Sequence, residues 1–317
     1  MKHYKNYIIV SAALLVIYAS LLIIPRLNKK DRAKVIFPKI KIDDITNFKI
    51  YSEKNPEHAV ELAGSGGQWM VMLATGKYTA DPVKISALKK AVAELRSQRS
   101  VTKNMADLPI YGLDDKTCIN LEIYEGEKLY GHILVGKNAR DFKSTYFKTF
   151  DGKEILISSE TLVSVLRGGP HEWIDHVIFS ISDSEAEEIT LPKTKLIKKE
   201  DKRWYFADTE KLTVDDGKVT NYLNIFNNFR TNDFEFEKTR EETGLVKPLR
   251  VLSLKTSDTT YEILQGNEEK QDVFVGIRIN GNELPMIYRF NKNRLEGLLK
   301  TPDQFVLEKK DSGIIKK

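Results

Sequence analysis

Residues 69–96 read WMVMLATGKYTADPVKISALKKAVAELR, and residues 204–230 read WYFADTEKLTVDDGKVTNYLNIFNNFR. Each stretch holds a tryptophan in a strand-like run, then an aspartate that can cap a helix, then apolar residues at helical spacing. The tryptophans lie 135 residues apart, and helical positions such as Leu88 and Tyr222 lie 134 apart. A pattern that recurs at nearly constant spacing indicates an internal repeat.

Further features recur in order after these stretches. Gly112, in Tyr-Gly-Leu, corresponds to Gly244, in Thr-Gly-Leu, and glycine can supply a positive φ at a turn. An alternating apolar hairpin follows each glycine, and each copy ends in short strands and a short helix. We take Trp69, Trp204, Gly112 and Gly244 as structural landmarks of the repeat, and we expect both tryptophans to be substantially buried. The alternative is chance similarity between two ordinary segments.

Residues 7–24 form a run of 18 residues without a charge, which Pro25 and Arg26 end. A helix of this length is about 27 Å long, close to the thickness of the hydrocarbon core of a bilayer. We predict one transmembrane helix here, with a cleaved signal peptide and a buried core helix as alternatives. The run continues past Ala19 and Ser20, which favours an uncleaved anchor.

The predicted fold class is therefore α+β: one N-terminal transmembrane helix, then two tandem related modules, each an antiparallel sheet covered by an amphipathic helix. The expected divisions are a cytosolic tail with the transmembrane helix and a basic flank (1–35), a first module (36–170), a second module (171–306) and a basic C-terminal tail (307–317).

The net charge of +5 is concentrated around the apolar run. Residues 1–35 hold seven Lys or Arg and one acid, which leaves 43 bases and 44 acids in the rest of the chain. A nucleic-acid-binding protein concentrates positive charge on its folded surface, so the sequence disfavours nucleic acid and favours the cytoplasmic membrane as a partner. The basic flank after residue 24 places the body in the cytoplasm by the positive-inside rule, whereas the signal-like start places it outside.

His171, Glu172, Asp175 and His176 are the densest group of potential metal ligands. The two histidines lie five residues apart and would not share one helix face as in a zinc-binding helix. A linker is the favoured interpretation, and we assign His171, Trp173, Asp175 and His176 to a groove expected between the modules. The charged run 198–203 is interpreted as a solvated turn.

Recognisable catalytic motifs are missing from the sequence. It has no nucleophile elbow and no phosphate-binding loop, and its single cysteine, Cys118, allows neither an intramolecular disulfide nor a cysteine-based metal cluster. We therefore assign no catalytic, cofactor-binding or metal-binding residue and expect no cofactor. Carboxylates are abundant, so a catalytic pair of acids stays open.

The order of these features, from the tryptophan through the capped helix and Tyr-Gly-Leu to a hairpin that ends in Val-Gly, resembles the bacterial family called domain of unknown function 4340. The first copy matches best, over residues 68–135, and the second departs at Thr243, where the tyrosine would stand. The resemblance implies a membrane-anchored extracytoplasmic protein found with components of gliding-motility-type ABC transporters. It carries over no catalytic residue.

Two classes of function remain. The leading hypothesis is a non-enzymatic accessory or scaffold protein, single-pass in the cytoplasmic (inner) membrane, whose extracytoplasmic modules engage ABC transporter subunits or another envelope complex. The rival is an envelope enzyme or ligand-binding sensor that uses the cleft between the modules.

Overall fold

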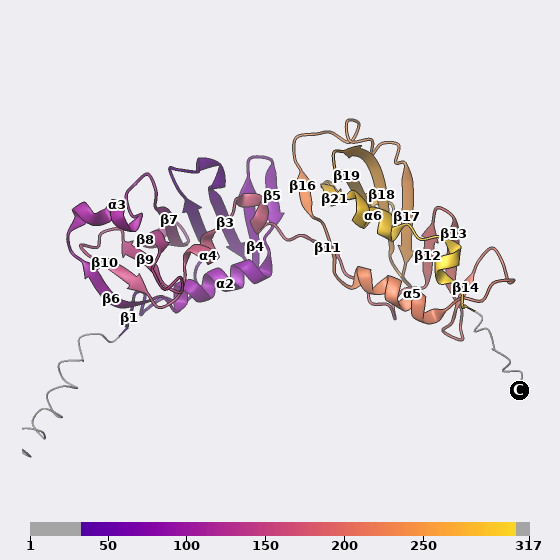
Figure 1. The fold of residues 1–317 in the computed structure, drawn as a ribbon, viewed down its shortest axis with the longest axis horizontal. Helices are drawn as coiled ribbons and strands as arrows, with labels where there is room; N and C mark the ends of the chain where they lie inside the picture. The colour runs from indigo at the N-terminus through magenta and orange to yellow at the C-terminus, as the bar shows by residue number, and fades with distance from the viewer. Residues whose placement is uncertain (1–32, 309–317) are drawn as a thin grey trace, which may run out of the picture. The chain divides into compact units, whose positions relative to one another are not determined.

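The computed structural model describes residues 33–308 (Figure 1). The chain divides into two compact units, one ending at Ile174 and the other beginning at Asp175. None of the helices within residues 33–308 is both long enough and apolar enough to cross a membrane. The predicted transmembrane run, residues 7–24, lies outside the described residues, as does most of the predicted tail at 307–317.

The first unit is built on ten strands: β1 (Lys34–Val35), β2 (Asn47–Tyr51), β3 (Val60–Ser65), β4 (Gln68–Leu73), β5 (Gly76–Thr79), β6 (Arg96–Thr102), β7 (Ile119–Glu125), β8 (Lys128–Asn138), β9 (Thr145–Thr149) and β10 (Ile155–Ser158). They form one antiparallel sheet in the order β1-β6-β10-β9-β8-β7-β2-β3-β4-β5. Its helices are η2 (Pro56–His58), α2 (Pro82–Ala93), η3 (Met105–Asp107), α3 (Leu108–Tyr111), α4 (Val163–Leu166) and η4 (Pro170–Trp173).

The second unit has a nine-stranded antiparallel sheet made of β12 (Glu188–Leu191), β13 (Thr194–Lys198), β14 (Trp204–Phe206), β16 (Asp233–Glu235), β17 (Arg250–Lys255), β18 (Thr260–Glu269), β19 (Asp272–Ile279), β20 (Asn282–Glu283) and β21 (Ile287–Asn291). The order is β14-β13-β12-β17-β18-β19-β21-β16, with β20 paired to β19. β11 (Val177–Phe179) and β15 (Phe229–Arg230) form a separate pair. The helices are α5 (Asp216–Leu223), η5 (Asn224–Asn228), α6 (Lys292–Leu298) and η6 (Pro302–Phe305).

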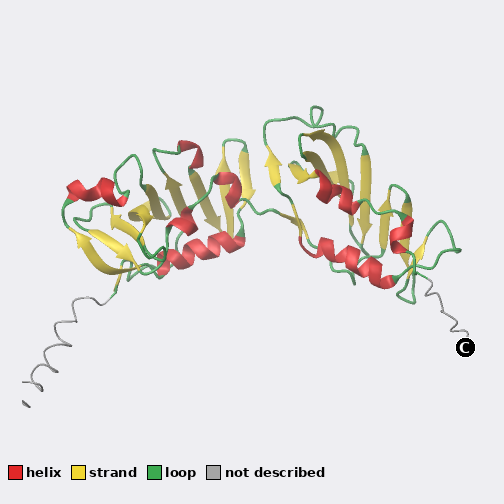
Figure 2. Cartoon of the chain, viewed as in Figure 1, coloured by secondary structure: helices red, strands yellow, loops and turns green. Residues whose placement is uncertain are grey.

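The predicted fold class is wrong. About 40% of the described residues lie in strands and about 20% in helices, most of them short (Figure 2). The units are antiparallel β structures rather than helix-covered α+β modules, and the described residues contain no membrane-crossing helix. The error has a physical origin: one helical run per unit is conspicuous in the sequence, whereas short strands spread along the chain supply most of the ordered residues.

Both units nevertheless follow one strand order. The run β6-β10-β9-β8-β7-β2-β3-β4 of the first sheet corresponds, strand by strand, to β16-β21-β19-β18-β17-β12-β13-β14 of the second. The α2 helix begins after Asp81 and α5 begins after Asp215, and each aspartate accepts two backbone N–H groups of the first turn. Leu88 on α2 and Tyr222 on α5 are both buried.

The glycine landmarks occupy equivalent turns. Gly112 has φ +68° and Gly244 has φ +74°, a region that L-residues rarely adopt. Each turn packs closely on the second strand after it, which is β8 in the first unit and β18 in the second. A Cβ atom on Gly136 would lie 2.3 Å from the carbonyl oxygen of Tyr111, and one on Gly266 would lie 2.1 Å from that of Thr243. Only glycine fits these two strand positions without a backbone shift.

The tryptophan landmarks differ in burial. Trp204 is 5% exposed, as expected, whereas Trp69 is partly exposed and stacks on Phe48 with ring centroids 5.2 Å apart. The cross-strand neighbour of Trp69 is Gly64, which leaves room for the indole, whereas that of Trp204 is Lys198, whose Nζ lies 5.1 Å from the ring centroid. Trp69 is therefore less deeply buried than Trp204, although most of its surface is shielded from solvent.

Candidate functional site

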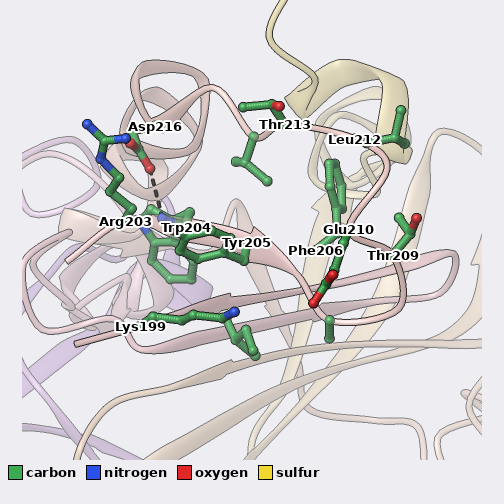
Figure 3. A pocket seen from close by; sticks show the side chains of 13 residues that line it. Lys199, Arg203, Trp204, Tyr205, Phe206, Thr209, Glu210, Leu212, Thr213 and Asp216 are labelled. Carbon is green, nitrogen blue, oxygen red and sulfur yellow. Dashed lines mark hydrogen bonds between the residues drawn. The ribbon is translucent and has the colours of Figure 1, made fainter. Parts of the chain in front are cut away.

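A pocket of about 330 Å³ opens at the β14 edge of the second sheet (Figure 3). One wall is β14 with the turn that joins it to β13, and the other is the segment 207–214 that leads to α5. The lining combines aromatic and aliphatic side chains with both signs of charge, including Trp204, Tyr205, Leu212, Lys199, Arg203 and Glu210. Ligand sites in proteins commonly combine apolar and aromatic walls with a few polar groups, which makes this pocket the candidate site.

The backbone of β14 contributes polar groups to this pocket. The N–H of Ala207 donates to Lys195, and the N–H of Lys199 donates to Arg203, so residues 203, 205 and 207 pair with β13. Antiparallel ladders alternate, which turns the N–H and C=O groups of Trp204 and Phe206 toward the open side. The N–H of Trp204 donates to Oδ1 of Asp216 at 2.8 Å.

Charged groups lie at both ends of the pocket. Lys199 places Nζ 4.4 Å from the ring centroid of Tyr205, and Arg203 extends from the same turn, whereas Glu210 lies at the far end of β14 (Figure 3). The Tyr205 hydroxyl donates to Asp201 at 2.7 Å. That bond raises the pKa of Tyr205 and lowers the pKa of Asp201, so the phenol stays protonated and the carboxylate ionised at neutral pH.

A second cluster of titratable groups lies on β2, β7 and β8 of the first unit. Tyr51 donates to Glu122 at 2.7 Å, and Tyr124 donates to the other oxygen of the same carboxylate. Burial opposes ionisation of Glu122, but the bonds from Tyr124 and Tyr51 outweigh burial and lower its pKa. Burial, and then the bond to Glu122, raises the pKa of Tyr51. A carboxylate with both oxygens bonded to protonated phenols is a structural anchor rather than a base poised for catalysis.

His132 lies beside this cluster. Its Nε2 is 2.9 Å from Oδ1 of Asn120, and its ring stacks on Phe150 with centroids 4.4 Å apart. Burial lowers the pKa of His132, although the nearby Glu122 acts in the opposite direction. Packing therefore disfavours the protonated form of His132.

The residues assigned to a groove between the modules are divided between the two units. Trp173, on η4 of the first unit, is fully buried and has Lys84 Nζ 5.5 Å from its ring centroid, while His171 on the same helix is exposed. In the second unit Asp175 accepts the N–H of Val177 at 2.9 Å, and His176 packs edge-on against Phe234. A site between the units stays a prediction.

Trp173 also has a counterpart in the repeat. The N–H of Asp81 donates to the carbonyl of Trp173 at 2.8 Å, and the N–H of Asp215 donates to that of Phe305 at the same distance. The side chain of Glu172 accepts the N–H of Gly169 at 3.3 Å. In the same way, the side chain of Gln304 accepts the N–H of Thr301 at 3.0 Å. The segment interpreted as a linker is thus the closing turn of the first unit. Within residues 33–308 no group of three or more His, Cys, Asp or Glu is placed to hold a metal ion.

The sequence did not reveal the β14 pocket. Its basic end, within 198–203, resembles any solvated turn. One difference between the two copies could have indicated it. Gly76 starts β5 with φ +147°, and the residue 134 positions later is Glu210. An L-residue rarely adopts that conformation, so the second copy does not form the β5 hairpin in the same way.

The fold is thus two like-ordered antiparallel sheets, with a pocket at one edge of the second sheet. A family model, domain of unknown function 4340, matches residues 69–248, and the chain belongs to this family. The match begins at the first tryptophan landmark and extends into both units. No curated protein matches the chain, and no solved structure does.

Proposed function

We propose that this protein is a non-enzymatic accessory or scaffold protein on the extracytoplasmic side of the cytoplasmic membrane, where it binds another envelope component such as an ABC transporter subunit. One observation carries the proposal: the two units share a strand order, but the second lacks a counterpart of β5, and a pocket opens at the β14 edge where that strand would lie. A duplicated framework whose second copy leaves a pocket at a sheet edge suits docking.

The location is supported by sequence. Residues 7–24 are apolar and uncharged between basic flanks, which would hold the chain at the membrane and raise its effective concentration beside a membrane partner. Protease added to intact spheroplasts should digest the body of the chain. Digestion only after the membrane is broken would contradict the extracytoplasmic location.

The lining of the pocket supports binding. Its hydroxyl, aromatic and charged side chains lie beside the outward backbone groups of β14, and together they offer donors, acceptors and apolar surface for recognition. The exposed Leu212, at 43% exposure, gives an apolar contact on the rim.

Affinity purification of the solubilised full-length chain tests the accessory role. We expect an envelope protein to copurify with the wild type, to be lost from Leu212→Asp, and to be kept by Leu249→Asp, a control in the same unit that is exposed and lies outside the pocket lining. Retention of the envelope protein by Leu212→Asp would favour the enzyme or sensor alternative. The same alternative would be favoured if the chain purified without a partner and turned over or bound a small metabolite.

A further inference from the structure

The last strand on one side of the second sheet is β14, whereas the equivalent strand β4 is followed by β5. In the first unit Trp69 accepts the N–H of Ala80 and Val71 pairs with Tyr78, so β5 and the residue after it satisfy the outward backbone groups of β4. In the second unit the corresponding outward groups belong to Trp204 and Phe206, and they border the pocket. An uncovered strand edge is a template for an added strand.

The chain connections on either side of this position are equivalent. Ala80 bridges Ile174 after β5, and Val214 bridges Val306 at the same point of the second unit. Ten residues separate Trp69 from Ala80 and nine separate Trp204 from Val214. Segment 207–213 therefore has almost the length needed to return along β14, but it follows an irregular path and leaves the pocket.

We propose that the second unit binds an extended segment of its partner protein as an added antiparallel strand along β14, in the position that β5 takes in the first unit. This proposal rests on the accessory role proposed above. The outward groups of Phe206 and the carbonyl of Trp204 provide main-chain hydrogen bonds, while Asp216 already accepts the N–H of Trp204. Leu212 and Trp204 provide the apolar contact.

Charge selects the direction of the added strand. An antiparallel strand places its C-terminal end beside Arg203 and Lys199 and its N-terminal end toward Glu210. At that end two basic side chains face the one carboxylate of Asp216, so the bound segment carries an acidic residue at its C-terminal end and, opposite Glu210, a basic residue at its N-terminal end. Residues 75–81 of the first unit, TGKYTAD, have this polarity, with Lys77 before Asp81.

A labelled synthetic peptide of residues 75–81 is the probe, titrated against the solubilised full-length chain. The N–H groups of Tyr78 and Ala80 face the paired strand in the intact protein, since Ala80 donates to Trp69. N-methylation at both amides should weaken binding by roughly ten-fold, because the strand loses two hydrogen bonds. Equal binding of both peptides would overturn strand addition.

A charge-reversal pair tests direction. Arg203→Glu should weaken the TGKYTAD peptide by roughly ten-fold and bind TGDYTAK better than the wild type does, whereas Lys193→Glu, at an exposed turn of the same unit, should change neither. Failure of the reversed peptide to recover binding would overturn the assigned direction. Failure of the wild type to bind TGKYTAD would overturn the proposal itself.

Competition separates this proposal from the accessory role. If a partner copurifies and excess TGKYTAD peptide displaces it, both the strand-addition proposal and the accessory role are supported. If a partner copurifies and the peptide neither binds nor displaces it, the strand site falls while the accessory role stands. If the peptide binds along β14 but no envelope protein copurifies, the accessory role falls.

Discussion

The backbone N–H of Trp204 donates a hydrogen bond to the carboxylate of Asp216 at 2.8 Å. This bond joins the edge strand β14 to the first turn of α5, and it protects one of the outward N–H groups of that edge. Proteins limit the pairing of exposed edges with such devices. The bond leaves Phe206 as the outward donor of β14 that is available for an added strand.

Removing this carboxylate should destabilise the second unit moderately. Asp216→Ala takes away the acceptor for the Trp204 N–H and a negative charge from the start of α5, so we expect the free energy of unfolding to fall by about 1 kcal/mol. Chemical denaturation measures the change. The matched control is Asp208→Ala, an exposed aspartate of the neighbouring loop, and an equal effect of the two substitutions would contradict the role of Asp216.

Trp173 and Phe305 should contribute similar amounts to the free energy of unfolding, each in its own unit. Trp173 is fully buried and Phe305 is 1% exposed, and both close their units at the N-cap of the main helix. Truncation of either to Ala should cost about 3–5 kcal/mol. Amide hydrogen exchange in each unit, monitored as denaturant is added, measures the loss of stability. Val83→Ala, at a side chain that is 75% exposed, is the control. A loss below about 1 kcal/mol for Trp173→Ala would show that its burial does not stabilise the first unit.

The stability of the first unit should fall as the pH is lowered from 7 to 5. Burial depresses the pKa of His132 below its ordinary value of 6.5, so the unfolded chain binds more protons near that pH than the folded chain does. The stabilisation is fully present above the pKa that His132 has in the unfolded chain. It is lost as the pH falls through the lower pKa that His132 has in the folded chain. The lowered pKa of Glu122 acts at lower pH, below its ordinary value of 4.5.

Denaturation at several pH values above 5 isolates the histidine. His132→Gln should give a shallower dependence of unfolding free energy on pH than the wild type, while His58→Gln, an exposed histidine of the same unit, is the control. An unchanged slope in His132→Gln would remove the proposed linkage.

Local patterns predicted several elements well, because they depend on adjacent residues. Asp81 followed by Pro82 marked the start of α2, and the apolar spacing around Leu88 identified its buried face. Gly112 and Gly244 were placed at turns with positive φ. The fold class was wrong because the balance between helix and strand depends on many short strands, and their order in each sheet depends on pairings between residues far apart in sequence.

The β14 pocket could not be predicted for a related reason. It depends on whether residues 207–213 return along β14; the second connection is one residue shorter than the first, and Glu210 stands where the first copy has Gly76 with a positive φ. Trp173 was misplaced in a linker because its match to Phe305 involves different residue types, and only the shared bonds to Asp81 and Asp215 show the equivalence.

The open edge of β14 is the central claim, and amide hydrogen exchange in the free chain tests it most directly. Val71 and Phe206 are buried side chains at equivalent positions, but the N–H of Val71 faces β5 and that of Phe206 faces the pocket. The exchange rates of Met70 and Tyr205, whose N–H groups face β3 and β13, serve as references for the stability of each unit. We expect Phe206 to exchange roughly ten-fold or more faster than Val71 after this normalisation, and to become protected when the TGKYTAD peptide is bound. Equal protection of Phe206 and Val71 in the free chain would show that the β14 edge is already covered and would contradict the account.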